Sequence, residues 1–245
     1  MRFPKNFLWG AASSAHQVEG NNFNDWTEWE KKNAKRLAKK AKKYYQKWQK
    51  EQFQEMLKKE NYISGRACDH YNRYEKDFDI AKSLNHNAHR FSIEWSRIEP
   101  EQGKFNQQEI EHYRKVILAL KRRGIEPFVT LWHWTNPVWF SEKGGFEKHR
   151  NIKYFVNYAE KMVKELGKDV KFWITINEPN IYVSNSYLKG VWFPQKRNIF
   201  KYRKVLFNLI KAHKLSYDII KNNFSKAKVG IAKNNIYFEV LIFFK

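Results

Sequence analysis

The sequence predicts an α/β protein built on a parallel sheet, and three observations lead to this fold class. Short apolar segments alternate with longer segments of helical periodicity along the whole 245-residue chain. The expected helices carry termination signals, such as Asn106 before one of them and Gly124 after it. One apolar segment, Phe172–Ile176, has no polar alternation and stops at Asn177-Glu178-Pro179, as a strand buried on both faces does when it ends.

Each element can be placed by its pattern. The expected strands cover residues 7–12, 86–93, 126–131, 172–178 and 228–235, and the first is expected to be buried. The expected helices cover residues 31–59, 69–84, 106–124, 152–166 and 204–222. The last of these helices is expected to bury Leu206, Leu209, Ile210, His213 and Tyr217. Five strand–helix units use the whole chain, so a barrel of eight such units would be cut short here.

The segment Lys31–Lys59 is unusually rich in lysine. Leu37, Ala41, Tyr44 and Trp48 are spaced four, three and four residues apart and form one apolar stripe. A basic amphipathic helix can bind membranes, but a narrow aromatic stripe favours a helix packed on the body of the protein. We expect one domain over residues 1–245, with a helical insertion at about 31–60 that lies away from the functional cleft.

Composition limits the classes of function. The chain has 47 Lys and Arg against 25 Asp and Glu, a net charge of +22, which suggests nucleic-acid binding. The basic residues are spread along the chain without a nucleic-acid motif, so nonspecific adhesion to polyanions is expected rather than a specific complex. The single cysteine, Cys68, allows no internal disulfide. No apolar run is long enough for a membrane span or a signal peptide, which predicts a cytoplasmic protein.

The residues at the strand ends carry the chemistry. Glu178 lies at the tip of a buried strand between two side-chain amides, although a simple strand-ending turn would give the same local pattern. Three other strands end in polar or aromatic groups: Gln17-Val18-Glu19-Gly20 follows the first, Arg90–Arg97 covers the second, and Leu131-Trp132-His133-Trp134 ends the third. In a parallel barrel these ends meet at one edge.

With these four segments in this order, the chain resembles the N-terminal part of family 1 glycoside hydrolases, the β-glucosidase and β-galactosidase group, which fold as (β/α)8 barrels. The resemblance implies a fold truncated after about five units and a retaining hydrolysis of β-glucosides or related β-glycosides. It further implies that Glu178 is the general acid/base and that Asn177 hydrogen-bonds the sugar 2-hydroxyl. Gln17, His133 and Trp134 match substrate-binding residues, while Arg90 and Asn234 match supporting residues.

Structural roles could also explain these residues. His133 between two tryptophans is typical of a hydrogen-bonded structural histidine, and a buried Arg90 is expected to pair with Glu94 or another carboxylate. This chain also has Thr135-Asn136-Pro137 where the family usually has Asp-Leu-Pro, and Glu94 where many members have a small or polar residue.

A retaining glycosidase needs two carboxyl groups, and the Thr/Ser-Glu-Asn-Gly segment that carries the second in the family is not found in this sequence. Two further hypotheses therefore stand beside the enzyme: a noncatalytic truncated fragment, and one half of a split enzyme that needs a complementary C-terminal half. The unpaired edges of an open sheet also predict association, either with such a half or as a homo-oligomer. A nucleic-acid-binding protein is a more remote hypothesis. The resemblance implies no metal and no cofactor. The apolar end, Val240–Phe244, is expected to be a β-prone segment.

Overall fold

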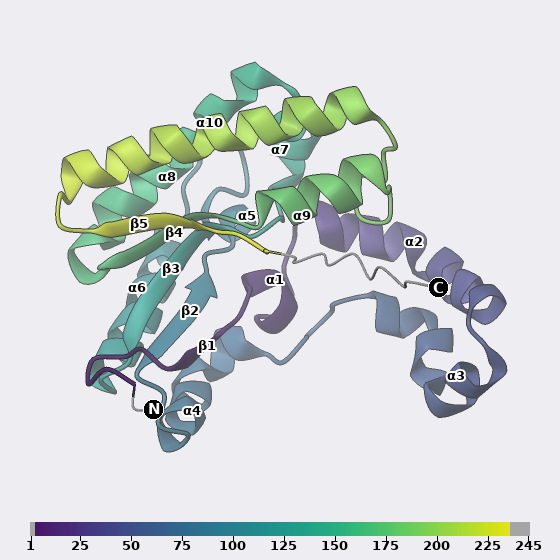
Figure 1. Cartoon of the computed structure of the whole chain (residues 1–245), viewed down its shortest axis with the longest axis horizontal. Helices are drawn as coiled ribbons and strands as arrows, with labels where there is room; N and C mark the ends of the chain where they lie inside the picture. The colour runs from purple at the N-terminus through teal and green to yellow at the C-terminus, as the bar shows by residue number, and fades with distance from the viewer. Residues whose placement is uncertain (1–2, 236–245) are drawn as a thin grey trace, which may run out of the picture.

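The fold is an open parallel sheet with helical crossovers, seen in a computed structural model that describes residues 3–235. The five strands lie side by side in chain order, and every neighbouring pair is parallel (Figure 1). The strands are β1 Gly10–Ala12, β2 Ala88–Ser92, β3 Glu126–Trp132, β4 Phe172–Asn177 and β5 Lys228–Ala232. The α/β fold expected from the sequence is therefore confirmed, with all the strands near their predicted positions. The predicted segment 240–244 lies outside the described residues.

Long helices connect the strands and cover one face of the sheet. The crossover helices are α4 His70–Ser83, α6 Gln107–Arg122, α8 Ile152–Leu166 and α10 Ile199–Asn223. In Figure 1, α10 runs across the sheet with α8 behind it. Asn106 caps α6 by accepting hydrogen bonds from the backbone N–H groups of Gln108 and Glu109, as its position in the sequence predicts. The apolar faces of these helices and the central strands form one core, in which Val129 and Ile117 are completely buried.

Short helices follow the strand ends. They are α1 Ala15–Val18 after β1, α5 Trp95–Ile98 after β2, α7 Val138–Glu142 after β3 and α9 Pro179–Val183 after β4. Short 3₁₀ turns, η3 Gly145–Glu147, η4 His149–Asn151 and η5 Gly167–Asp169, complete the connections, and η6 Ser184–Leu188 is a π-helical turn that extends α9. The polar segments singled out in the sequence thus all lie at the carboxyl edge of the sheet.

The first strand differs from the expectation of a buried strand over residues 7–12. Regular pairing covers only Gly10–Ala12, all of it exposed, and Trp9 is 48% exposed. The physical reason is topological: β1 lies at one edge of the sheet and pairs only with β2. The side chain of Asn87 takes over part of the pairing, since it accepts from the Trp9 N–H and donates to the Phe7 carbonyl. β5, at the other edge, is also only partly buried.

The lysine-rich segment is largely helical, as predicted, but its buried face matches the predicted one only in part, at Ala41 and the half-buried Leu37. It forms α2 Asp25–Tyr44, α3 Lys47–Gln52, η1 Gln54–Leu57 and η2 Lys59–Tyr62, and it projects from the body beyond the carboxyl edge of the sheet (Figure 1). The buried side chains of α2 include Ala34, Ala38 and Ala41, whereas Tyr44 and Trp48 are exposed. Because the helix ends at Tyr44 and a new one begins at Lys47, the predicted stripe breaks before Trp48.

The predicted face of the last helix is also wrong in part. α10 buries Leu209 as expected, together with Val205, Asn208, Ala212, Ser216 and Ile220. Ile210 and Tyr217, which were expected to be buried, are 47% and 39% exposed. The buried face of α10 includes the polar residues Asn208 and Ser216. A prediction based on hydrophobic residues alone therefore chose a neighbouring face of the helix.

Candidate active site at the carboxyl edge of the sheet

Glu178 leaves the sheet in an unusual backbone conformation. Its φ of 41° lies in the left-handed region, which a non-glycine residue rarely adopts, and Pro179 then starts α9. Its N–H still donates to the Ala232 carbonyl of β5 at 2.7 Å, so the residue is fixed at the last rung of the β4–β5 pair. The carboxylate is therefore held at the strand end, half-buried, by a strained turn and not by a flexible loop.

Asn177 and His133 form a polar pair between the ends of β4 and β3. Asn177 Nδ2 lies 2.9 Å from His133 Nε2, and Asn177 is only 2% exposed. Burial, with the positive charge of Arg90 adding to it, lowers the pKa of His133 to about 3, so the ring is neutral at pH 7. Because the amide N–H₂ can only donate, Nε2 is the acceptor and Nδ1 carries the proton.

This pair leaves two polar groups available. Among the described residues, His133 Nδ1 and Asn177 Oδ1 are both buried without a hydrogen-bond partner. One is a donor and the other an acceptor, and a buried polar group without a partner is costly unless a ligand or water supplies one. A sugar hydroxyl both donates and accepts, so the pair is suited to binding one.

Trp134 is anchored more firmly than the sequence suggested. Its backbone is left-handed, with a φ of 78°, and its indole Nε1 donates to the Asn177 carbonyl at 3.0 Å. Its ring centroid is 4.6 Å from that of Trp192, which in turn is 5.6 Å from that of Trp26. Trp134 therefore offers a ring face rather than its N–H to any bound molecule in this arrangement.

A cavity of about 240 Å³ opens beside these residues. It is lined by Ser14, His16, Gln17, Trp26, His133, Trp134, Thr135 and Trp192. Gln17 is exposed, and its Oε1 accepts from Ser14 Oγ at 2.8 Å. Gln17, His133 and Trp134 thus share one cavity, and Asn177 joins them through its bond to His133. The lining includes indole faces and neutral polar groups but no carboxylate.

Glu178 is not among the residues that line this cavity; it follows Asn177 directly in the chain, and two other predicted residues lie near it. Asn234 Nδ2 is 3.5 Å from Glu178 Oε1, the upper limit for a hydrogen bond. Burial lowers the pKa of Arg90, and the negative charge of Glu178 opposes that shift, so the guanidinium and the carboxylate are within electrostatic range. The alternative that Arg90 pairs with Glu94 is not seen: within residues 3–235 Arg90 forms no salt bridge, its Nε lacks a partner, and Glu94 bonds Ser96 and Thr135 instead.

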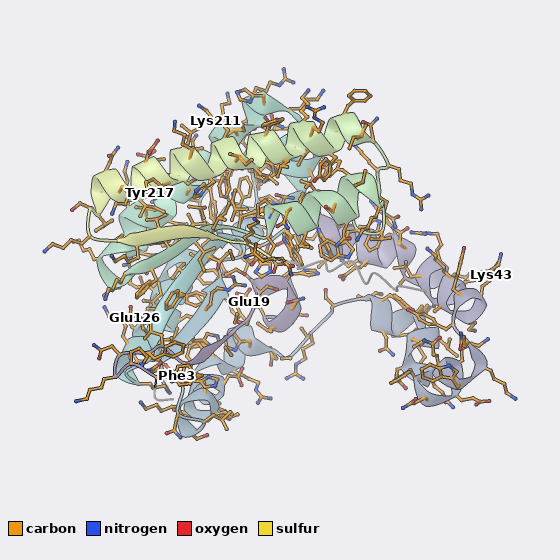
Figure 2. All side chains as sticks on the ribbon, in the orientation of Figure 1. Phe3, Glu19, Lys43, Glu126, Lys211 and Tyr217 are labelled. Atoms are coloured by element: carbon orange, nitrogen blue, oxygen red, sulfur yellow. The ribbon has the colours of Figure 1, made fainter. Side chains whose placement is uncertain are left out.

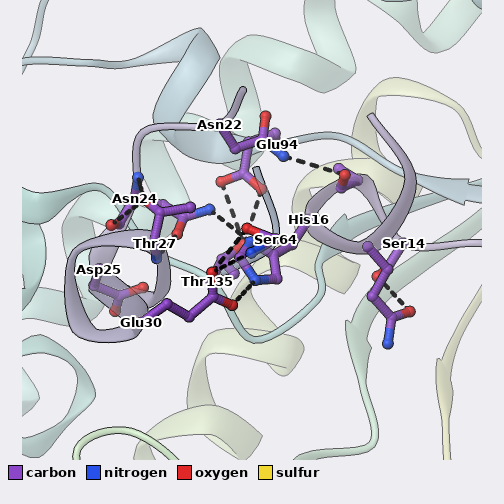
Figure 3. Close-up of polar contacts among 12 residues, drawn as sticks. Ser14, His16, Asn22, Asn24, Asp25, Thr27, Glu30, Ser64, Glu94 and Thr135 are labelled. Atoms are coloured by element: carbon purple, nitrogen blue, oxygen red, sulfur yellow. Dashed lines mark hydrogen bonds and ion pairs between the residues drawn. The ribbon is translucent and has the colours of Figure 1, made fainter. Parts of the chain in front are cut away.

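Glu94 instead supports the loop that follows β3. It is 1% exposed, and its carboxylate accepts from Ser96 Oγ at 2.8 Å. It also accepts from Thr135 Oγ1 at 3.0 and 3.2 Å (Figure 3). Asp25, at the start of α2, accepts from both the backbone N–H and the side chain of Asn136. The Thr135-Asn136-Pro137 segment is therefore fixed by hydrogen bonds to two buried carboxylates, those of Glu94 and Asp25.

Several lining residues were not predicted from the sequence. His16 lies within a motif that was noted, and its Nε2 is 3.0 Å from Glu30 Oε1, with Ser64 donating to the other Glu30 oxygen (Figure 3). Its place next to Gln17 was the signal that could have identified it. Trp26 and Trp192 were visible only as tryptophans, and no strand-end pattern distinguished them from core residues.

Among residues 3–235, no group of three or more histidine, cysteine, aspartate or glutamate side chains is arranged to hold a metal ion. In that same part of the chain, no helix has the length and apolar character needed to cross a membrane.

Comparisons with known proteins identify the family. The model of the family described as "Glycosyl hydrolase family 1" matches residues 1–239. Beta-glucosidase A from Thermotoga maritima is 34% identical over 239 residues, which cover 97% of this chain and 50% of that protein.

Solved structures show the same relation. A beta-glycosidase from Pyrococcus horikoshii is 42% identical with a TM-score of 0.79, and the match covers 95% of this chain and 48% of that one. The Thermotoga maritima beta-glucosidase in complex with castanospermine is 32% identical with a TM-score of 0.84 and covers 98% of this chain and 51% of the other. The chain therefore spans about half the length of the relatives it matches.

Proposed function

Because the chain belongs to glycosyl hydrolase family 1, we propose that it forms the N-terminal half of a β-glucosidase-type catalytic barrel that hydrolyses β-glucosides or related β-glycosides with retention. The observation that carries this proposal is the grouping of His133, Asn177 and Glu178 at the carboxyl edge of the sheet, where His133 also lines a cavity walled by tryptophans. Indole faces suit the apolar faces of a sugar ring, and the donor and acceptor of the His133–Asn177 pair suit its hydroxyls.

In this proposal each residue has a defined role. Glu178 protonates the glycosidic oxygen as the bond breaks and later removes a proton from the attacking water. Asn177 hydrogen-bonds the sugar 2-hydroxyl, a contact that strengthens in the transition state. Gln17 and His133 bind the hydroxyls on the far side of the ring, and Trp134 supports that side. No metal or cofactor takes part, because two carboxyl groups suffice for this chemistry.

The second carboxylate must come from another segment. A retaining mechanism places two carboxyl groups about 5–5.5 Å apart, and this sequence lacks the Thr/Ser-Glu-Asn-Gly segment that carries the second one in the family. Unpaired sheet edges tend to associate with further strands, and β1 and β5 form the two edges of this sheet. We therefore propose that a complementary half, supplying strands six to eight between β5 and β1, completes the site. Association with a second copy of the chain would also cover these edges, without supplying the second carboxylate.

We also propose a cytoplasmic location, on the basis of the cysteine content. A single cysteine is typical of a protein from a reducing compartment, which supports a cytoplasmic role in carbohydrate metabolism.

The test is complementation. The chain alone is expected to hydrolyse an aryl β-glucoside near the uncatalysed rate, and co-expression with the C-terminal half of a family 1 relative should restore turnover. Glu178→Gln in the reconstituted enzyme should abolish hydrolysis of substrates with poor leaving groups, while an activated aryl glucoside retains more of its first step. Robust activity of the chain alone would refute the need for a second half.

Complementation also distinguishes the enzyme from a noncatalytic fragment and from a nucleic-acid-binding protein. Failure to gain activity with any complementary half would favour the noncatalytic fragment. A sequence-specific complex with nucleic acid that resists salt would favour the more remote nucleic-acid-binding function.

A further inference from the structure

We propose that the projecting segment α2–α3 is a docking surface for an anionic lipid bilayer, which holds the protein peripherally on a membrane without crossing it. The first observation is a block of charge of one sign. Residues 31–50 contain no Asp or Glu, and their basic residues are Lys31, Lys32, Lys35, Arg36, Lys39, Lys40, Lys42, Lys43, Lys47 and Lys50. A juxtamembrane block of several Lys and Arg is typical of binding to anionic headgroups.

These charges are free to act on a partner. Within residues 3–235, only Lys31 and Lys47 of this block form salt bridges, with Glu28 and Glu51. All the lysines of α2 are exposed. Figure 2 shows Lys43 on the projecting segment, far from Glu126 of β3. The block is therefore a positive surface that the described part of the protein does not neutralise.

The second observation is a group of aromatic side chains at the end of the same surface. Tyr44 is 71% exposed, Trp48 55%, Phe53 49% and Tyr45 42%. The apolar side of α2, with Ala34, Ala38 and Ala41, is already covered, because it packs against η1 and η2. The exposed aromatics are thus additional to the segment's own small core, and exposed apolar groups beside charge mark an interaction surface.

Charge and aromatic side chains share one helix face. Arg36, Lys40 and Tyr44 follow at intervals of four residues, and Lys40 Nζ lies 5.3 Å from the centroid of the Tyr44 ring. Trp48 lies on the next helix, where its Nε1 donates to Gln46 Oε1. α2 therefore presents a row of cations that ends in tyrosine, and the exposed Trp48 lies on the helix that follows.

This combination favours a lipid surface over a nucleic acid. Tyrosine and tryptophan are enriched at the level of the headgroups, where an apolar ring and a polar tip are both satisfied. Nine of the ten cations are lysine, a compact point charge that suits a diffuse anionic surface, whereas nucleic-acid sites favour the planar guanidinium and a groove lined by stacking rings. The aromatic side chains here lie on a projecting helical segment (Figure 1).

Vesicle sedimentation tests this proposal with the full chain at physiological salt. The chain should bind vesicles of phosphatidylcholine with about a third phosphatidylserine, and should not bind phosphatidylcholine alone. The triple variant Lys35→Gln, Lys39→Gln and Lys43→Gln should lower partitioning about 100-fold, at about one kcal/mol per lysine near the surface. Glutamine matches lysine in helix propensity, so the fold of α2 is kept, which circular dichroism verifies.

The matched control removes the same net charge from another exposed surface. Lys204→Gln, Lys211→Gln and Lys214→Gln on α10 should change partitioning less than about threefold. Trp48→Ala, made alone in the native chain, should also lower binding to the vesicles, although it does not change the charge. Equal losses in the two triple variants would show that only net charge matters and would overturn the proposal. So would tighter binding to a single-stranded RNA oligonucleotide than to the vesicles, lost with the α2 substitutions.

Discussion

Asn177 and His133, 44 positions apart in the sequence, bind each other through one amide N–H and one imidazole lone pair 2.9 Å away. This contact fixes the tautomer of a neutral histidine and leaves Nδ1–H and the amide oxygen without partners among residues 3–235. The hydrogen bond therefore orients both side chains at once. Without it, neither the His133 Nδ1–H nor the Asn177 Oδ1 would point in a fixed direction. A substrate that satisfies both groups removes a cost that the free protein carries.

Asn177→Ala should therefore affect both residues of the pair. It removes the donor that orients His133 and the proposed direct contact of Asn177 with the substrate. In the reconstituted enzyme we expect kcat/KM for an aryl β-glucoside to fall by about 100-fold or more, a loss typical for one hydrogen-bonding group at a reacting centre. Steady-state kinetics provide the measurement.

The matched control for this variant is Asn223→Ala, at the far end of α10, where the amide only donates to the Ile219 carbonyl. It should leave kcat/KM within about twofold. An Asn177→Ala enzyme with unchanged kcat/KM would contradict the proposed contact with the substrate.

Glu94 should matter to folding because its carboxylate is buried and accepts hydrogen bonds from Thr135 and Ser96. Glu94→Gln places an N–H₂ group where an acceptor is needed, and we expect the free energy of unfolding to fall by about 1–3 kcal/mol. Urea denaturation of the chain measures this. The exposed Glu51→Gln is the matched control, expected to change stability by less than about 0.5 kcal/mol. Equal stability of both variants would show that the Thr135 loop does not depend on this carboxylate.

The sequence predicted the sheet and the strand-end residues well because both depend on local patterns. Strands buried on both faces are continuous apolar runs, and Asn177-Glu178-Pro179 carries its own stop signal. Parallel topology then brings Gln17, His133 and Asn177 to one edge without any knowledge of packing.

The remaining features depended on partners distant in the sequence. Trp9 is exposed because β1 is an edge strand, and its apolar run gave no sign of that. The hydrogen bonds of Glu94 to Thr135 join separate strand ends, so neither residue alone indicated that the carboxylate would support this loop. Trp192 reaches the cavity from the segment after α9, where no periodic pattern guided the prediction.

Gly10 is expected to be intolerant of any side chain. A Cβ built at this position would lie 1.9 Å from the Ala88 carbonyl oxygen, since β1 passes directly along β2. Gly10→Ala should therefore push the two strands apart and lower the free energy of unfolding by about 1–3 kcal/mol. Thermal and urea unfolding provide the measurement. In Gly230→Ala, on the opposite edge strand β5, the new methyl meets no described atom within 4 Å. That variant should be neutral or slightly stabilising, by up to about 1 kcal/mol, and a comparable loss in both variants would disprove the steric explanation.

The fold is expected to lose stability in acid partly through His89. Burial lowers the pKa of His89 to about 4, and His89 shares its surroundings with Phe78, whose ring centroid is 5.4 Å away. The unfolded chain binds a proton at this residue near pH 6.5, whereas the folded protein resists it until about pH 4. The unfolded state therefore binds more protons in this window, and the contribution of His89 to stability is lost as the pH falls from about 6.5 to about 4. His89→Gln should flatten the pH dependence of the free energy of unfolding over that interval, measured by urea denaturation at each pH. The His89 ring resonances of the native protein should stay constant by NMR down to about pH 5. A titration of that ring near pH 6.5, or an unchanged slope in the variant, would rule out this origin of the acid sensitivity.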